Sequence, residues 1–352
     1  MDLINDILVP QLESRPISKP IDLVKLIFQA VMGGGHMISD PEVSLKYLKH
    51  ELVSCKASHD PLFEVMGERV CRYNISSVKN GLRPETLNRL FVYSANKVKG
   101  SREELVLRLE EVRAAMERGE LSLPFSAEEF FAAYPEEGEI PRHSEEYREK
   151  YAPAYRVLCR ESMQFYPLIE RIDNFLSNGV YPVICIDGMA ASGKTSLAEL
   201  LSAAFDCAVF TPDDYFLTPA QRTPERLSVV GDFFDRERMY GEIISHIKDG
   251  EVTYRKYDCG TFSFGSPVTV SLEKKVVVVE GVYSAHPYMS DYFDVGVFMK
   301  TAPETQSSRI LARNGEYLHR MFINEWIPRE NAYFSRFGIE DRLSMKGFVF
   351  NT

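Results

Sequence analysis

The stretch Gly188-Met-Ala-Ala-Ser-Gly-Lys-Thr195 decides how the chain around it must fold. It matches the pattern G-x-x-x-x-G-K-[ST], which binds phosphate when a strand precedes it and a helix follows it. Both flanks have the required character, because Val183–Asp187 is a short apolar run that predicts a buried strand and Thr195–Ala204 predicts a helix. This context disfavours the alternative, a glycine-rich loop that matches by chance. The sequence therefore predicts a phosphate-binding P-loop.

Each part of the predicted loop has an expected role. Gly188 and Gly193 permit the tight backbone turn that points successive N–H groups at an anion, and the following helix adds its positive end. Lys194 is expected to reach the β- and γ-phosphates of ATP, and the Thr195 hydroxyl is expected to bind Mg²⁺. The residues expected to bind these cofactors are Gly188, Ala190, Ala191, Ser192, Gly193, Lys194, Thr195 and Ser196.

Composition and charge limit the classes to which the protein can belong. Its 352 residues suggest about two domains, and 45% hydrophobic residues suffice for packed cores. The net charge is −10 and neither half is basic, which argues against the usual nucleic-acid interface. The N-terminal residues lack the basic region of a signal peptide, and no apolar run is long enough to span a membrane. Six scattered cysteines indicate reduced thiols, so we expect a cytoplasmic protein.

Two domains are predicted, a mainly helical domain of unknown role over residues 1–175 and a P-loop domain over residues 176–352. Within the first, Phe63–Val78 indicates a strand or hairpin, and Glu145–Leu158 indicates a helix. Three isolated histidines are interpreted as ordinary surface or core residues: His50, His59 and His143.

Gly33–Gly35 and the adjoining His36 follow a helical pattern and leave two interpretations open. The glycines can end the helix and form a turn, or they can form an anion-binding loop with His36 beside it. No predicted strand precedes them, so the first interpretation is favoured. A second activity centred on His36 is the corresponding, less favoured hypothesis, because this region shows no spacing typical of a metal site or a catalytic triad.

After the P-loop, predicted strands and helices alternate, which is typical of a parallel sheet covered by helices on both faces. Ala208–Thr211 and Lys274–Glu280 are two of the predicted strands. In such sheets ligands bind at the carboxyl ends of the strands. Asp213 and Glu280 both follow or end a strand, so we expect them to meet the P-loop in one crevice.

Phosphoryl transfer to an alcohol needs Mg²⁺, a phosphate-binding loop, neutralising charges and a base near the acceptor hydroxyl. Asp213 or Asp214 is expected to be that base, and Glu280 is expected to hold Mg²⁺ or its water. Three arginines are expected to close over the transferred phosphoryl group: Arg309, Arg313 and Arg320. The alternative for each of these charges is an ordinary surface or salt-bridged residue.

Four further landmarks accompany the P-loop, in the order Asp213-Asp-Tyr-Phe216, Asp232-Phe-Phe-Asp235, Tyr257-Asp258 and Val279-Glu280-Gly281. With them, residues 181–334 resemble the uridine kinase and phosphoribulokinase family of P-loop kinases, to which bacterial-type pantothenate kinases are related. The resemblance implies that Asp213 is the general base and that Arg309 and Arg313 belong to a lid. It also implies that three residues bind the acceptor, with Asp235 holding its hydroxyl groups: Tyr215, Asp235 and Tyr257.

The sequence departs from this family where a uridine kinase recognises its base. A uridine kinase would place a histidine and an arginine after Tyr257-Asp258, whereas Cys259–Phe264 contains neither. The absence of these groups puts a nucleoside acceptor in doubt and leaves phosphoryl transfer unaffected. Trp326, next to the expected lid, either stacks on a ligand or serves as a buried anchor.

The sequence therefore predicts an ATP- and Mg²⁺-dependent small-molecule kinase that phosphorylates a hydroxyl of a nucleoside, sugar or similar polyol. One alternative is the same machinery acting on a pantothenate-like or phosphosugar acceptor. Another is a regulatory ATP-binding protein without turnover, which would not need the acceptor-side base Asp213. The expected partners are ATP and a small hydroxyl-bearing substrate, and assembly into a homo-oligomer remains open.

Overall fold

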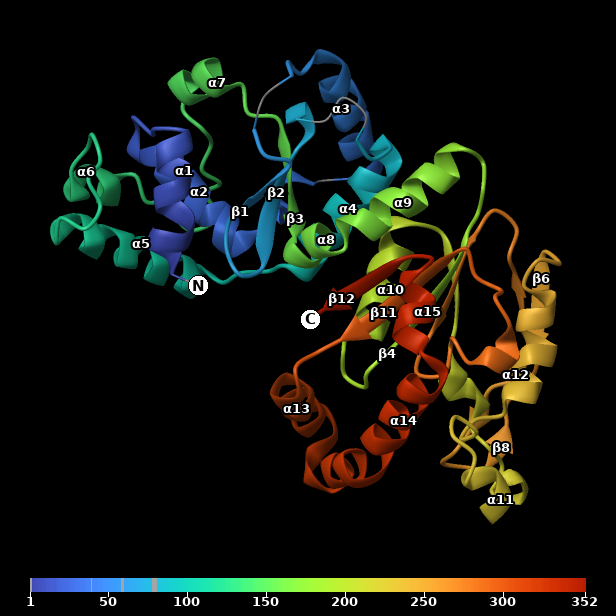
Figure 1. Cartoon of the computed structure of the whole chain (residues 1–352). Helices are drawn as coiled ribbons and strands as arrows, with labels where there is room; N and C mark the ends of the chain where they lie inside the picture. The colour runs from blue at the N-terminus through green and yellow to red at the C-terminus, as the bar shows by residue number, and fades with distance from the viewer. Residues whose placement is uncertain (1, 39, 58–59, 78–80) are drawn as a thin grey trace. The chain divides into compact units, whose positions relative to one another are not determined.

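The chain divides into two compact units, Met1–Asp173 and Asn174–Thr352, and the five-stranded parallel sheet lies in the second. The structure is a computed structural model that describes residues 2–38, 40–57, 60–77 and 81–352 (Figure 1). His59 and Val78 lie outside the described residues. Within these ranges, no helix is both long and apolar enough to cross a membrane.

The first unit combines helices with a small antiparallel sheet (Figure 1). Among its described residues, β1 (Phe63–Val65), β2 (Val70–Asn74) and β3 (Tyr155–Cys159) pair in that order. β1 and β2 form a hairpin, one of the two structures predicted for this stretch. The helical elements are η1 (Leu3–Leu8), α1 (Val9–Ser14), α2 (Pro20–Met32), η2 (Gly35–Met37), α3 (Pro41–Ser54), η3 (Ile75–Ser77), α4 (Pro84–Lys97), α5 (Arg102–Glu117), α6 (Ala127–Ala132), α7 (Glu145–Tyr151), α8 (Arg160–Gln164) and, across the unit boundary, α9 (Tyr166–Ser177).

The prediction of one helix over Glu145–Leu158 is wrong. The helix α7 ends at Tyr151, and the chain continues as the strand β3. Ala152 takes the left-handed backbone conformation, with φ 41° and ψ 53°, and Pro153 disfavours a right-handed helical conformation for the residue before it. All five residues of β3 are buried, and they pair with β2. The sheet contacts therefore outweigh the helical spacing of the sequence, and the first unit is helical around a sheet.

A five-stranded parallel sheet forms the centre of residues 174–352, all of which the structure describes. Its strand order is β12 (Phe348–Asn351), β11 (Val295–Lys300), β4 (Val183–Gly188), β10 (Val276–Glu280) and β5 (Cys207–Phe210). Every neighbouring pair is parallel. All residues of β4 and β10 are buried, which explains why they form nearly continuous apolar runs. The predicted α/β fold is confirmed.

Helices pack along this sheet. α10 (Lys194–Ala204) contacts β4, β5 and β10, and α15 (Ile339–Ser344) contacts β11 and β12. α13 (Pro303–Met321) is broken at Gly315, which has φ 74° and ψ 173°. The other elements of residues 178–352 are η4 (Pro212–Tyr215), η5 (Pro219–Gln221), α11 (Pro224–Leu227), α12 (Arg236–Glu242), η6 (Ile244–His246), η7 (Pro287–Met289), η8 (Phe322–Trp326), α14 (Ile327–Phe337), and the hairpin pairs β6 (Glu251–Tyr254) with β9 (Val268–Ser271) and β7 (Tyr257–Asp258) with β8 (Ser263–Phe264).

The sheet topology determines where a ligand can bind. Because neighbouring strands are parallel, their carboxyl ends lie at the same edge of the sheet. β4 ends at Gly188, β10 ends at Glu280, and β5 leads into η4, which contains Asp213. The P-loop and the two carboxylates therefore come from adjacent strands at one edge.

The close approach of β11 to the chain before β12 gives a test of this packing. A Cβ atom at Gly347 would overlap the backbone carbonyl oxygen of Gly296 on β11. We expect Gly347→Ala to lower the free energy of unfolding by about 2 kcal/mol or more, because backbone cannot move aside as a flexible side chain can. Urea titration followed by the fluorescence of Trp326, the chain's single tryptophan, measures this for the second unit.

Gly241→Ala is the matched control. Gly241 lies in α12, and a Cβ atom there would meet no other atom within 4 Å. Alanine is favoured over glycine within a helix, so the control is expected to leave stability unchanged or raise it by up to about 1 kcal/mol. Equal stability of the two variants would contradict the packing described for β11 and β12.

Candidate active site

The backbone of the P-loop has the conformation that its glycines were expected to permit. Gly188 has φ +137°, and a Cβ atom there would overlap the backbone of Met299 on β11. Gly193 has φ +89° where α10 begins, and Ala191 also has a positive φ, 55°. The Ser192 side chain is buried, and its hydroxyl has no hydrogen-bond partner in the described part of the chain. An unpaired buried donor within such a loop suits a bound anion.

Lys194 occupies the centre of the site. Its side chain is largely buried, and its ammonium donates to the carbonyl oxygens of Gly188 at 2.8 Å and Met189 at 2.9 Å. These are loop carbonyls, so the ammonium lies directly beside the backbone that would surround a phosphate. A phosphate oxygen is a charged acceptor and forms a stronger hydrogen bond with an ammonium than a carbonyl does.

Thr195 and Glu280 form the pair expected to hold Mg²⁺. The Thr195 hydroxyl donates to Glu280 Oε1 at 3.2 Å, although the two residues lie 85 positions apart. Burial raises the pKa of Glu280, Lys194 opposes this shift, and Asp213 adds to it. A hydroxyl and a carboxylate are oxygen ligands of the kind Mg²⁺ takes alongside water and substrate phosphates. No group of three or more His, Cys, Asp or Glu among the described residues could hold a metal by itself. The residues therefore fit a metal ion shared with a phosphate.

The structure separates the two candidate bases that the sequence left open. Asp214 forms an ion pair with Lys256 at 3.0 Å. The Asp213 side chain is exposed and forms no hydrogen bond or ion pair with any described residue. The protein atoms around its carboxyl raise the pKa of Asp213, Lys194 and Arg313 oppose this shift, and Asp214 adds to it. Asp213 is therefore the carboxylate that faces Lys194 and is available to act as a base.

The three predicted arginines lie at different distances from this chemistry. Arg309, on α13, donates to the carbonyl oxygen of Ala191 at 3.2 Å and therefore lies at the rim of the loop. Arg313 donates to Asn314, and its charge acts on Asp213. Arg320 is exposed, and no hydrogen bond or ion pair joins it to the described residues of the site. The structure thus brings Arg309 and Arg313 to the site but not Arg320.

The predicted acceptor-binding residues have unequal freedom to bind a ligand. Tyr215 is fully buried, and its hydroxyl donates to Glu242 at 3.2 Å, so it serves as a structural anchor. Asp235 caps α12 and accepts a 2.7 Å hydrogen bond from Gln221. Tyr257 is buried, and its hydroxyl has no partner among the described residues. β7 contacts η4, which contains Asp213, so Tyr257 lies near the candidate base and, unlike Tyr215, has a hydroxyl without a partner among the described residues.

Two carboxylates that the sequence analysis did not single out also belong to the site. Glu330, on α14, accepts a hydrogen bond from the backbone N–H of Ala190 at 3.0 Å. Burial raises the pKa of Glu330 to about 7, although Lys194 and the Ala190 N–H oppose this. Asp187, at the end of β4, is fully buried and accepts hydrogen bonds from the Gly188 N–H at 2.7 Å and the Tyr333 hydroxyl at 2.8 Å. Burial raises the pKa of Asp187 as well.

These two residues differ in how far the sequence could have revealed them. Asp187 is a carboxylate within an otherwise apolar strand, which is a detectable signal. Glu330 lies 140 positions from its partner in the loop and belongs to an ordinary charged helix, so no local pattern distinguishes it.

Comparison with known proteins gives a similarity of fold. No protein-family model matches the chain, and no curated protein sequence matches it. A solved structure of a "possible uridine kinase" from Bacillus stearothermophilus is similar at 23% identity, covering 52% of this chain and 99% of that chain, with a TM-score of 0.38. The D-glycerate 3-kinase of Cryptococcus neoformans var. grubii is similar at 18% identity, covering 48% of this chain and 86% of that chain, with a TM-score of 0.34. These similarities concern the fold alone and cover about half of the chain.

The raised pKa of Glu330 predicts a pH dependence of stability. The folded state keeps the Glu330 proton up to about pH 7, whereas the unfolded chain loses it near pH 4.5, so the contribution of Glu330 to stability decreases as pH rises through this interval. Glu330→Gln keeps an acceptor for the Ala190 N–H and removes the charge. We expect the variant to gain about 1 to 3 kcal/mol of stability relative to wild type between pH 5 and pH 8.

Urea unfolding at several pH values, followed by Trp326 fluorescence, checks this expectation. Glu325→Gln controls for the change in net charge, because it removes a partly exposed carboxylate that pairs with Arg329 at 2.6 Å. A Glu330→Gln stability difference that is the same at pH 5 and pH 8 would contradict the assignment of a proton to Glu330.

Proposed function

We propose that residues 174–352 form an ATP-dependent kinase that transfers the γ-phosphoryl group to a hydroxyl of a small molecule. The observation that carries the proposal is the Asp213 carboxylate, which is unpaired among the described residues and lies at the same sheet edge as Lys194 and the Thr195–Glu280 pair. A nucleotide-binding switch needs the loop and the metal-binding oxygens, but it has no use for a base on the acceptor side.

In the proposed function, the P-loop binds the phosphates of ATP. Lys194 exchanges its contacts with the Gly188 and Met189 carbonyls for phosphate oxygens, and the loop N–H groups together with the start of α10 hold the β-phosphate. Thr195 and Glu280 are the residues that would hold Mg²⁺, directly or through its waters. When bound, Mg²⁺ neutralises the charge on the phosphates.

In the proposed reaction, Asp213 is the general base. Asp213 accepts the proton of the acceptor hydroxyl while that oxygen forms a bond to the γ-phosphorus. The bond from the γ-phosphorus to the bridging oxygen breaks, ADP leaves, and Asp213 later releases the proton to solvent. The raised pKa of Asp213 makes it a stronger base than an ordinary aspartate. Arg313 and Arg309 supply positive charge beside the transferred group.

The acceptor side favours a polyol, sugar or pantothenate-like molecule over a nucleoside. The β7–β8 hairpin carries Cys259–Phe264, in which Asp258 accepts the Gly260 N–H at 2.7 Å and the side chains of Phe262 and Phe264 are exposed. This stretch lacks the histidine and arginine with which a uridine kinase would recognise the base, whereas the Tyr257 hydroxyl, which has no partner among the described residues, suits an acceptor hydroxyl.

We also propose a cytoplasmic setting for this activity. None of the six cysteines, all among the described residues, forms a disulfide. Cysteines without disulfides are usual where thiols are kept reduced, and ATP is available as a substrate in the same compartment.

An ADP-release assay tests the proposed function and identifies the acceptor. ATP and Mg²⁺ are supplied together with nucleosides, sugars, polyols or pantothenate, one at a time. ADP release that depends on one acceptor supports the proposal. Tight ATP binding without acceptor-dependent release across the whole panel would favour the regulatory alternative.

Asp213→Asn should abolish most of the turnover while ATP binding persists. We expect kcat to fall by about 10²–10⁴-fold, because the variant cannot accept the proton, and the Kd for ATP to change little. Asp214→Asn is the matched control, because the neighbouring carboxylate is already paired with Lys256. The role of Asp213 would be contradicted if both variants lost turnover equally, or if neither variant lost turnover.

A further inference from the structure

A hollow of about 590 Å³ in the first unit has an unbalanced charge. Four cationic side chains line it, and they come from α2, the chain before and within α7, and β3: Lys25, Arg142, Arg148 and Arg156. The one carboxylate in its lining, Glu51, already pairs with Arg156 at 2.8 Å. No ion pair joins Lys25, Arg142 or Arg148 to any described residue, in a chain whose net charge is −10.

Lys25 is the cation that most needs an anion. Its residue is only 7% exposed, and its ammonium forms a hydrogen bond with His36 Nε2 at 2.9 Å. No ion pair joins it to any described residue, and the charged groups that act on it are the cations Arg72 and Arg142. Burial, together with these two cations, lowers the pKa of Lys25 to about 8. A buried ammonium without a carboxylate is costly, and a bound anion removes most of that cost.

His36 holds this ammonium in place. An ammonium can only donate, so Nε2 of His36 accepts, and the proton of the neutral ring lies on Nδ1. Burial and the charge of Lys25 lower the pKa of His36 to about 4, which keeps the ring neutral. Gly33 ends α2 with φ 67°, so the glycines form a helix end, the favoured interpretation of the sequence. The group in this region suited to bind an anion is instead the Lys25 ammonium, which His36 holds by a hydrogen bond.

Beside Lys25, a chain of hydrogen bonds joins buried polar groups of α2 to the chain before α7 and to β3. His143 donates from Nδ1 to Asp22 at 3.1 Å, and the Tyr155 hydroxyl lies 3.0 Å from both His143 Nε2 and Gln29 Oε1. Ser144 donates to Asp22 from its backbone N–H at 2.9 Å and from its hydroxyl at 2.6 Å. His143 is thus part of an ordered polar wall, which is more than the sequence indicated. A fixed wall lowers the entropic cost of binding a small ligand.

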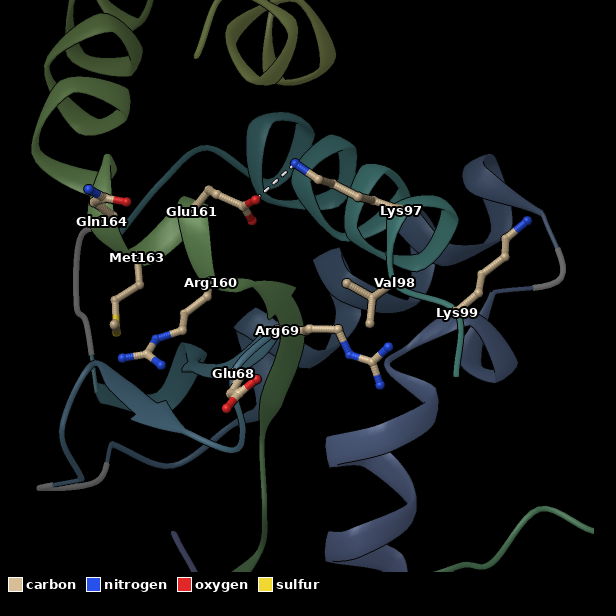
Figure 2. Close-up of a pocket in the computed structure, with 9 residues that line it drawn as sticks. All are labelled: Glu68, Arg69, Lys97, Val98, Lys99, Arg160, Glu161, Met163 and Gln164. Carbon is tan, nitrogen blue, oxygen red and sulfur yellow. Dashed lines mark hydrogen bonds and ion pairs between the residues drawn. The ribbon is translucent and has the colours of Figure 1, made fainter. Parts of the chain in front are cut away.

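In a second hollow of the same unit, of about 680 Å³, lining cations are paired with carboxylates (Figure 2). It is also lined by several cations, but Lys97 pairs with Glu161 at 3.0 Å, as the dashed line in Figure 2 marks. Arg69 pairs with Glu104 at 2.6 Å. The volume of a hollow and the presence of basic residues in its lining therefore do not by themselves identify an anion-binding site. The hollow at Lys25 differs because three of its four lining cations, all except Arg156, form no ion pair with a described residue.

We propose that the hollow formed by α2, α3, α7 and β3 binds a small phosphorylated metabolite, with the phosphate between Lys25, Arg142 and Arg148. Three cations suit a phosphate dianion, and arginine can bind it through two parallel hydrogen bonds. Tyr47, 71% exposed on α3, also lines the hollow and offers an aromatic surface to the organic body of the metabolite. This site is separate from the P-loop and does not depend on the kinase activity.

The test measures binding to the full chain in a Lys194→Met background, so that the P-loop does not contribute its own phosphate site. Isothermal titration calorimetry with glycerol phosphate, ribose 5-phosphate and inorganic phosphate compares a phosphate with and without an organic body. We expect the Arg142→Gln Arg148→Gln variant to weaken binding by at least about ten-fold. Both arginines are exposed, so this variant is expected to fold. Lys25→Met should weaken binding by a similar factor or more.

Lys99→Gln is the matched control, because it removes an exposed lysine from the other hollow (Figure 2). It should bind the probes as the parent does. The proposal is overturned if none of the three probes binds at concentrations up to about 10 mM. It is also overturned if the Lys25 and arginine variants bind as tightly as Lys99→Gln. Loss of binding in the Lys194→Met background relative to wild type would assign the phosphate to the P-loop instead.

Discussion

The parallel pairing of β4 with β10 determines the geometry of the site. In this register Glu280 lies opposite Ile186, and the Gly281 N–H donates to the Ile186 carbonyl at 3.0 Å. A shift of one residue would turn the Glu280 side chain to the opposite face of the sheet. The 3.2 Å hydrogen bond between Thr195 and Glu280, and with it the proposed Mg²⁺ site, therefore depends on backbone hydrogen bonds between two buried strands.

One buried cation organises the charges around this edge of the sheet. Lys194 opposes the raised pKa values of four carboxyl groups, which the surrounding protein atoms shield from water: Asp187, Asp213, Glu280 and Glu330. A cluster with more carboxylates than cations is costly to form without a ligand. Additional cations, as Mg²⁺ and the lid arginines would provide, reduce that cost. The same imbalance, with opposite sign, occurs around Lys25 in the first unit.

Local patterns in the sequence predicted the second unit well, because its key features are contiguous. The strand, loop and helix around Gly188–Thr195 lie within about twenty-five residues, and the four valines of β10 can only form a strand buried on both faces. The edge of the sheet at which the site residues meet could also be predicted, since the carboxyl ends of parallel strands lie at the same edge. Position in the sheet left Asp213 and Asp214 open as the base and only the family resemblance favoured Asp213, because the contact of Asp214 with Lys256 is not visible in the sequence.

Local sequence patterns did not predict the features that depend on contacts between residues far apart in the chain. The strand β3 was predicted as part of the helix before it, and its pairing with β2 more than eighty residues earlier decides its structure. His143 is an isolated histidine in the sequence and contacts Asp22 across 121 positions. Similarly, Glu330 and the hollow at Lys25 arise only when helices and loops far apart in the chain pack together.

The measurement that tests the central claim most directly is a crystal structure of the full chain with Mg²⁺ and a non-hydrolysable ATP analogue. The account predicts that the β-phosphate lies among the N–H groups of residues 190–195, that Lys194 exchanges the Gly188 and Met189 carbonyls for phosphate oxygens, and that Mg²⁺ lies beside Thr195 and Glu280. It also predicts that Asp213 faces the γ-phosphate across the space for an acceptor. A nucleotide bound elsewhere, with Lys194 still on its loop carbonyls and Glu330 still on Ala190, would contradict it.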